Sequence, residues 1–258
     1  MATVITGAET WSAEGSGPPA GELGVLLVHG FTGNPVSLRP LGEGLADRGF
    51  AVELPRLPGH GTHWRDLQRT SWGDWVGEAT AAFERLRGRT RAQVVAGLSM
   101  GGTIALHLAE TRSEEVAGVV VINPWLFSTD RRLKALPLLK LAVPGIPGIG
   151  NDIARPGGDE KPYATTPLRA LASVLRLQVN VRERLGQVTA PILIFTSRQD
   201  HVVEPDNSAL VLSSVGSTDK EQRWLERSYH VATLDYDAGE IIQATGDFAL
   251  RVTAETGG

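Results

Sequence analysis

Residues 94–110 read VVAGLSMGGTIALHLAE, a stretch that places glycines on both sides of Ser99. An apolar, β-branched run precedes the serine, and apolar residues at helical spacing follow it. Glycine weakens a regular element because it loses more backbone entropy on ordering than alanine does, so its repetition here needs another reason. At a sharp turn from strand to helix, glycines let the two elements approach closely and hold a serine hydroxyl at the carboxyl end of the strand. The pentapeptide 97–101, G-x-S-x-G, therefore predicts that Ser99 is a nucleophile.

The rest of the chain alternates short apolar runs with segments of helical length. Strands are predicted at 25–28, 50–54, 93–96, 116–122, 192–196 and 223–225, and helices at 37–48, 72–86, 102–110, 206–214 and 237–252. This alternation predicts an α/β fold with a mostly parallel central sheet and helices on both faces. Strands that are apolar throughout fit a sheet that is covered on both sides.

The alternation stops in residues 125–188, where prolines recur and no strand pattern is visible. An apolar run at 135–150 and a helix-like segment at 167–185 lie within this region. A break of this length is too long for an ordinary loop and favours a cap or lid over the sheet. We therefore expect a core formed by residues 1–124 and 189–258, with residues 125–188 inserted as a cap.

Length, net charge and composition exclude several classes of protein. A chain of 258 residues fits a single α/β domain, and the net charge of −4 gives no electrostatic case for binding nucleic acid. Cysteine is absent, which excludes disulfides and thiolate metal sites and fits a reducing compartment. The N-terminal residues lack the basic start and apolar core of a secretory signal, and no run approaches the ~18 apolar residues of a membrane span. These features predict a cytoplasmic protein.

A serine nucleophile needs a base, and the base needs an orienting carboxylate. Three histidines follow Ser99 in the sequence. His107 falls inside the helix after the serine, where we expect a structural role. His201 adjoins Asp200, and we expect it to be a loop residue. His230, in RSYHVATLD between the last strand and the last helix, is where the base belongs in a sheet with the chain order serine, acid, histidine.

The orienting acid is expected directly after the strand at 192–196. Asp200 stands there, in TSRQDHVVEP, and is the favoured candidate. Glu204 is the competitor, but it lies further into the loop and precedes Pro205.

Two backbone N–H groups are needed to bind the oxyanion that forms during acyl transfer. Met100, next after the nucleophile, supplies one in this kind of turn. The second is expected from HGFTGN (residues 29–34), where Phe31 has the right offset. His29 precedes the nucleophile and ends a strand, so we interpret it as holding this loop in shape.

No cofactor or metal is expected. His60 and His63, in PGHGTHW, have a spacing seen among metal ligands, but no third ligand stands nearby and a metal site needs at least three. The GIPGIG segment is not a dinucleotide-binding fingerprint and follows no strand.

Several of these segments together resemble a known family. HGFTGN, PGHG, GLSMGG, GND (residues 150–152), DHVVEP and SYHVATLDYD are similar to segments of bacterial monoacylglycerol lipases and small carboxylesterases of the α/β-hydrolase fold. The resemblance extends from about Val25 to Phe248. It implies a small cap inserted after the sixth strand, an apolar tunnel for an acyl chain and a polar pocket for a glycerol head.

The resemblance also implies site residues. It assigns the triad to Ser99, Asp200 and His230, with Phe31 and Met100 as the oxyanion donors. A cap glutamate receives the glycerol hydroxyls in this family, and Glu160 in GGDEKPY is the position that matches best. The alternative is that Glu160 is a solvated cap charge.

The function predicted is therefore hydrolysis of monoacylglycerols to glycerol and fatty acid through an acyl-serine intermediate. The first alternative is a broad carboxylesterase or thioesterase acting on short or medium acyl chains. The second is a non-catalytic binding module on the same fold. The expected partner is a small-molecule ester, and the apolar cap stretch 136–149 suggests transient contact with a lipid surface.

Overall fold

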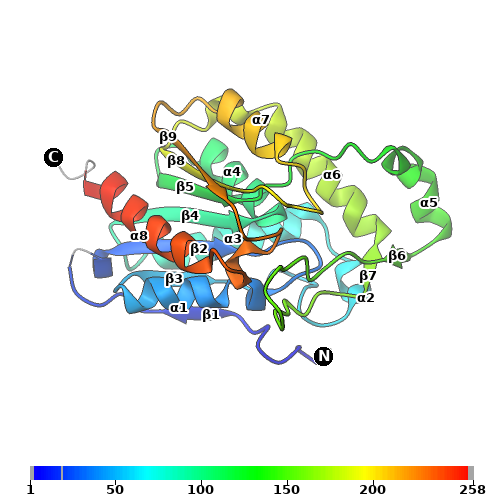
Figure 1. Ribbon diagram of the computed structural model, residues 1–258, viewed down its shortest axis with the longest axis horizontal. Helices are drawn as coiled ribbons and strands as arrows, with labels where there is room; N and C mark the ends of the chain where they lie inside the picture. Colours follow the sequence, from blue (N-terminus) through cyan, green and yellow to red (C-terminus); the bar gives the residue numbers. More distant parts are fainter. Residues whose placement is uncertain (1–2, 19, 255–258) are drawn as a thin grey trace.

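A seven-stranded sheet forms the centre of the computed structural model, which describes residues 3–18 and 20–254 (Figure 1). The strand order is β1-β3-β2-β4-β5-β8-β9, with β1 antiparallel to β3 and the other neighbours parallel. The strands are β1 (Trp11–Ala13), β2 (Leu23–Val28), β3 (Ala51–Leu54), β4 (Ala92–Leu98), β5 (Val116–Ile122), β8 (Ile192–Ser197) and β9 (Lys220–Leu225). This is the mostly parallel α/β sheet that the sequence predicts.

Helices cover both faces of this sheet, as predicted (Figure 1). Along β2, Leu26 and Val28 belong to one apolar cluster, whereas Val25 and Leu27 belong to the other, because successive side chains of a strand point to opposite faces. The first face carries α3 (Trp72–Arg87), α4 (Met100–Thr111), α6 (Leu168–Arg182) and α7 (Asp206–Ser214); the second carries α1 (Arg39–Asp47) and α8 (Ala238–Ala254).

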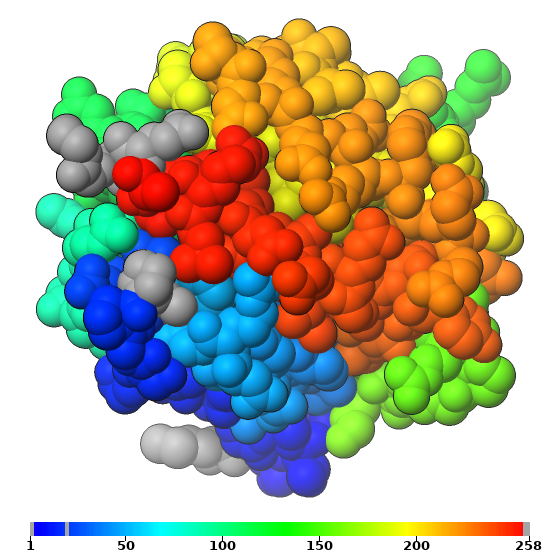
Figure 2. All heavy atoms as spheres, turned by 60° about the vertical axis from the view of Figure 1, so that its left-hand side comes forward, coloured from blue at the N-terminus to red at the C-terminus, as the bar shows by residue number. Residues whose placement is uncertain are grey.

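The two helices of the second face are far apart in sequence but lie side by side (Figure 2). Arg48, at the end of α1, donates to the carbonyl of Gln243 at 2.6 Å and pairs with Asp247 at 2.5 Å, both in α8. These contacts fix α8 beside α1, so the C-terminal and N-terminal parts of the chain cover the same face of the sheet.

The segment between β5 and β8 contains η3 (Arg131–Ala135), α5 (Leu136–Ala142), β6 (Gly145–Pro147), β7 (Thr165–Pro167), α6 and η4 (Leu185–Gln187). β6 and β7 pair as a small antiparallel sheet, so the expectation that no strand lies in this region is wrong. The expectation that the insertion follows the sixth strand is also corrected. The segment follows β5, which is the fifth strand of the described residues, because a single strand, β1, precedes β2 there. In Figure 1, α5 lies at the opposite end of the molecule from the C-terminus.

Short elements complete the fold: η1 (Ala20–Glu22), η2 (Pro35–Ser37), α2 (Trp64–Leu67) and η5 (Ala232–Leu234). Within the described ranges, no helix combines the length and the apolar character that crossing a bilayer requires.

Candidate active site

Ser99 occupies a strained turn between β4 and α4. Its φ of 56° and ψ of −119° are unusual for a residue with a side chain, and such a conformation costs on the order of 1–3 kcal/mol. Three backbone hydrogen bonds hold it: the Ser99 N–H donates to the Ile122 carbonyl at 3.0 Å, and the Ser99 carbonyl accepts from Thr103 and Trp125 at 3.2 Å each. Strain that the surrounding structure maintains in this way is typical of functional positions.

The glycines around Ser99 are required by close backbone approach. A Cβ at Gly97 would lie 2.1 Å from the Gly101 carbonyl oxygen, and a Cβ at Gly101 would lie 1.9 Å from the Val28 carbonyl oxygen. Real Cβ atoms do not approach other atoms so closely. The prediction that these glycines let helix and strand meet at the serine is confirmed.

His230 and Asp200 form a direct pair. The Nδ1 atom of His230 lies 2.7 Å from Oδ2 of Asp200, and both side chains are buried, with 9% and 2% exposed. The other carboxylate oxygen, Oδ1, accepts from the N–H groups of Val202 at 2.8 Å and Val203 at 2.7 Å. The carboxylate is therefore fixed by its own loop and oriented toward the imidazole. Since it occupies Nδ1, the opposite nitrogen, Nε2, is left as the atom that can exchange a proton with a substrate or nucleophile.

The pKa of His230 is raised above the ordinary histidine value. Burial, the largest single effect, lowers this pKa, but the charge and hydrogen bond of Asp200 together with the charges of Glu160 and Asp152 outweigh it. An imidazole in this setting accepts a proton readily and stays stable when charged, as a general base must.

Ser99 and His230 both line one cavity of about 850 Å³. Most of its wall is apolar, and its apolar lining includes Leu98, Trp125, Leu133, Leu136, Ile146 and Leu171. Glu160 and Asp152 contribute polar groups to the same cavity. The cavity therefore combines a mostly apolar wall with carboxylates, next to Ser99 and His230.

The two expected oxyanion donors lie beside Ser99. Met100 is the first residue of α4, and Phe31 follows Gly30, where a Cβ would lie 3.4 Å from the Ser99 Cβ. Neither the Phe31 nor the Met100 N–H has a hydrogen-bond acceptor among the described residues. An N–H without a protein acceptor beside a serine is suited to bind a developing negative charge.

Glu160 is buried rather than a solvated charge. Its Oε1 accepts from the Asn151 N–H at 3.1 Å, and its own N–H donates to Oδ1 of Asn151 at 2.9 Å. Burial raises the pKa of Glu160, against the lowering effect of the Asn151 bond. A buried carboxyl with a free oxygen facing a cavity can accept a hydrogen bond from a hydroxyl.

The remaining histidines have the local roles expected of them. His107 pairs with Glu110 within α4 at 2.8 Å. His29 accepts the Leu57 N–H at Nε2 at 3.2 Å and contacts the Gly30 carbonyl through Nδ1 at 3.0 Å, and burial lowers its pKa to about 4. It therefore holds the Phe31 loop in shape while neutral.

His60 and His63 each make local contacts. His60 is buried with Nδ1 beside the Pro58 carbonyl at 3.1 Å, and His63 accepts the Arg65 N–H at the start of α2. Within residues 3–18 and 20–254, no group of three or more histidine, aspartate or glutamate side chains is arranged to hold a metal ion.

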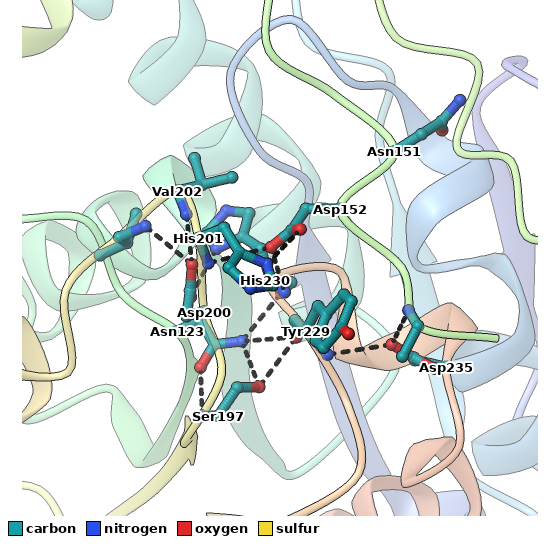
Figure 3. A network of polar contacts seen from close by, with 12 residues as sticks. Asn123, Asn151, Asp152, Ser197, Asp200, His201, Val202, Tyr229, His230 and Asp235 are labelled. Carbon is teal, nitrogen blue, oxygen red and sulfur yellow. Dashed lines mark hydrogen bonds and ion pairs between the residues drawn. The ribbon is translucent and has the colours of Figure 1, made fainter.

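Three polar residues that the sequence did not single out support the histidine loop (Figure 3). Asn123 follows β5 and donates to the His230 carbonyl at 2.8 Å, while its Oδ1 accepts the Ser197 N–H at 2.8 Å. Asp152 accepts the His230 N–H at 3.1 Å, and Asp235 accepts the Tyr229 N–H at 3.0 Å. Asp152 lies in the GND segment, and Asp235 lies in SYHVATLDYD. The resemblance to a known family drew attention to both segments, but it did not assign a role to either aspartate.

Comparison with known proteins places this arrangement in a family. The Hydrolase_4 family, described as serine aminopeptidase S33, matches residues 22–237. The chain is 41% identical over 255 residues to a thermostable monoacylglycerol lipase of Bacillus sp. (strain H-257), with 96% of each chain covered. It is 28% identical to a carboxylesterase of Bacillus subtilis (strain 168), with 90% of this chain and 94% of that protein covered.

Solved structures agree with the sequence relatives. A structure from work on LipS and LipT, two metagenome-derived lipolytic enzymes, superposes with a TM-score of 0.92 at 39% identity, covering 96% of this chain and 100% of that chain. The crystal structure of a Paleococcus ferrophilus monoacylglycerol lipase superposes with a TM-score of 0.77 at 20% identity, covering 95% and 99%, and supports the fold alone. The chain therefore belongs to the Hydrolase_4 family and has the α/β-hydrolase fold.

Proposed function

We propose that this protein is a carboxylic ester hydrolase that cleaves monoacylglycerols to glycerol and a fatty acid, with Ser99, Asp200 and His230 as its catalytic triad. The observation that carries the proposal is the 2.7 Å pair between a buried aspartate and a histidine that shares a largely apolar cavity with the strained serine. The identity of 41% to a monoacylglycerol lipase over nearly the whole chain supports the same substrate class.

In this mechanism, Oγ of Ser99 attacks the ester carbonyl carbon while Nε2 of His230 takes the hydroxyl proton. Asp200 keeps the proton of the neutral imidazole on Nδ1 and stabilises the imidazolium that forms. The N–H groups of Phe31 and Met100 bind the oxyanion. His230 then protonates the departing glycerol oxygen, and the acyl-serine remains. A water molecule, deprotonated by His230, attacks the acyl carbon. As the bond from the acyl carbon to Oγ of Ser99 breaks, His230 returns the proton to Oγ, which releases the fatty acid and restores the serine.

Residues 125–188 act as the cap in this proposal, over a core of residues 1–124 and 189–258. The apolar cavity wall contributed by η3, α5 and β6 accommodates the acyl chain. α6 connects the cap with the core, because Val174 and Leu177 pack in the apolar cluster of the first sheet face.

Glu160 recognises the head of the substrate. Its buried carboxyl lines the cavity that holds Ser99, and the raised pKa reflects a group with little water around it. Glycerol hydroxyls donating to this carboxyl would place the ester near the nucleophile. An ester without hydroxyls on its alcohol gains nothing from this contact.

A comparison of head groups tests the substrate class. We expect a glycerol monoester to be hydrolysed with a higher kcat/KM than the methyl ester of the same fatty acid, and Glu160→Ala to remove the difference. Asp206→Ala, which removes an exposed carboxylate at the start of α7, is the control and should preserve the difference. Equal rates on both esters, unchanged in Glu160→Ala, would instead identify a broad carboxylesterase. A series of acyl lengths on the glycerol monoester then defines the chain preference.

The cap also offers a surface for transient contact with lipid. Leu138 is 77% exposed and Leu141 is 74% exposed, both on α5 beside the cavity. Apolar side chains exposed together mark an interaction surface. We expect Leu138→Ser with Leu141→Ser to reduce co-sedimentation with neutral lipid vesicles, whereas Val179→Ser, on α6, should leave it unchanged. Equal binding of all three proteins would remove this part of the proposal.

The cytoplasmic location stays a prediction from composition. Fractionation of cells that express the untagged protein, with detection by antibody, tests it.

A further inference from the structure

One carboxylate of the inserted segment joins the two loops that carry the acid and the base (Figure 3). Asp152 lies between β6 and β7, and its side chain is mostly buried. Its Oδ2 accepts the backbone N–H groups of His201 and His230, each at 3.1 Å, and its Oδ1 lies 2.8 Å from Nδ1 of His201. The loop after β8, which contains Asp200, and the loop after β9, which contains His230, therefore share one anchor.

A second carboxylate fixes the segment that carries this anchor. Asp235 accepts the N–H groups of Ala154 at 2.7 Å and Arg155 at 2.9 Å, in addition to the Tyr229 N–H. The backbone carbonyl of Asp152 accepts the Val231 N–H at 3.0 Å. Residues 152–155 are thus hydrogen-bonded to the histidine loop both through Asp152 and through Asp235.

A carboxylate is the suitable side chain for this anchor. Each carboxylate oxygen can accept more than one hydrogen bond, so Asp152 satisfies two N–H groups through Oδ2 and an imidazole through Oδ1. Hydrogen bonds to an ionised group are shorter and stronger than neutral ones. Its negative charge also lies near the imidazole that becomes positive when Ser99 loses its proton, and that charge favours the charged form of the base.

We propose that Asp152 is a positioning residue for the ester hydrolysis: it holds the loops of Asp200 and His230 in register and adds negative charge beside the base. The inference rests on the proposed function of the triad. It makes residues 152–155 of the inserted segment part of the apparatus that positions the triad.

The pH dependence of kcat/KM depends on the charged groups around His230. Asp200, Glu160 and Asp152 face His230, and each raises its pKa against the lowering effect of burial. Asp152 in turn faces His201 and interacts with Glu160. Removing the Asp152 charge should therefore lower the pKa of His230 and shift the acidic limb of kcat/KM to lower pH.

The experiment compares Asp152→Asn, Asp152→Ala and, as a matched control, Asp206→Asn, an exposed change at the start of α7. We expect Asp152→Ala to lower kcat about tenfold to a hundredfold with a smaller change in KM, as misplacement of a catalytic group does. Asp152→Asn keeps an acceptor oxygen and should recover part of kcat, with the acidic limb still shifted to lower pH. Asp206→Asn should match the wild type in kcat, KM and pH profile.

Thermal unfolding of each variant accompanies the kinetics. A wild-type kcat and an unshifted limb in folded Asp152→Asn and Asp152→Ala would overturn the proposal. A lower Tm with a reduced kcat but no shift of the limb would show that Asp152 only stabilises the fold, which also overturns it. Failure of the triad itself is distinguishable, because it would appear as Ser99→Ala retaining wild-type hydrolysis.

Discussion

Replacing Asp200 by asparagine tests its proposed role as the carboxylate that orients His230. The side chain is buried, and its Oδ1 accepts two backbone N–H groups that an asparagine oxygen can still satisfy. The change falls on the other oxygen, which lies 2.7 Å from Nδ1 of His230. An amide NH₂ in that place donates to Nδ1 and forces the proton onto Nε2, the atom that accepts the proton of Ser99 in the proposed mechanism. We expect the fold to be retained and the proposed base to be held in the wrong tautomer.

The expected loss follows from this geometry. Reversing the tautomer and removing the stabilising charge in a serine triad lowers kcat by about 10⁴-fold. At 1.36 kcal/mol for each factor of ten, this corresponds to about 5 kcal/mol of transition-state stabilisation. The raised pKa of His230 should fall at the same time, because Asp200 is the largest of the groups that raise it.

Steady-state hydrolysis of a glycerol monoester at pH 8 measures kcat, and thermal unfolding reports the fold. Asp206→Asn serves as the matched control. Glu204→Gln tests the competing acid, whose Oε1 pairs with Thr129 at 2.5 Å. The reasoning is refuted if Asp200→Asn stays within tenfold of the wild type while Glu204→Gln loses activity.

Three further predictions concern stability and pH. Gly101→Ala should lower the free energy of unfolding by about 3 kcal/mol or more, since its Cβ would lie 1.9 Å from the Val28 carbonyl oxygen, whereas Gly77→Ala in α3, with no atom within 4 Å, should raise it by about 0.5–1 kcal/mol. Urea titrations measure both, and equal effects would contradict the packing argument. The pKa of His29 is about 4 in the folded state, below its ordinary 6.5, so the unfolded chain binds the extra proton first as the pH falls. This residue alone should reduce the free energy of unfolding by about 2 kcal/mol between pH 7 and pH 5, and a flat profile would count against it. Because the pKa of His230 is raised above 6.5, the acidic limb of kcat/KM should have its midpoint above pH 6.5. A measured midpoint below pH 6.5 would contradict this prediction.

The sequence predicts those parts of the fold that depend on local pattern. The strand at 116–122 and the helix at 206–214 are found with the predicted bounds, because uninterrupted apolar runs and helical spacing are strong local signals. β1 is only three residues long, and β9 begins with the polar residues Lys220 and Glu221, so neither has such a signal over its full length. β6 and β7 form from proline- and glycine-containing segments that pair with each other, which local patterning disfavours.

The same distinction applies to the site. The turn at Ser99 is predictable because its glycines and its strand-to-helix context are contiguous. The pairing of Asp200 with His230 follows from chain order in a parallel sheet, since both residues follow strands whose carboxyl ends meet at one edge. Asp152 and Asn123 could not be assigned in this way, because their partners are backbone groups from distant segments that only the tertiary fold brings within reach.

Covalent labelling of the nucleophile tests the central claim most directly. A fluorophosphonate should add to one residue of the native protein, and mass spectrometry of the digested adduct should locate it on Ser99. Labelling should cease in Ser99→Ala, and hydrolysis of a glycerol monoester should cease with it. A native protein that is not labelled, or a Ser99→Ala protein that hydrolyses the ester at the wild-type rate, would contradict the account.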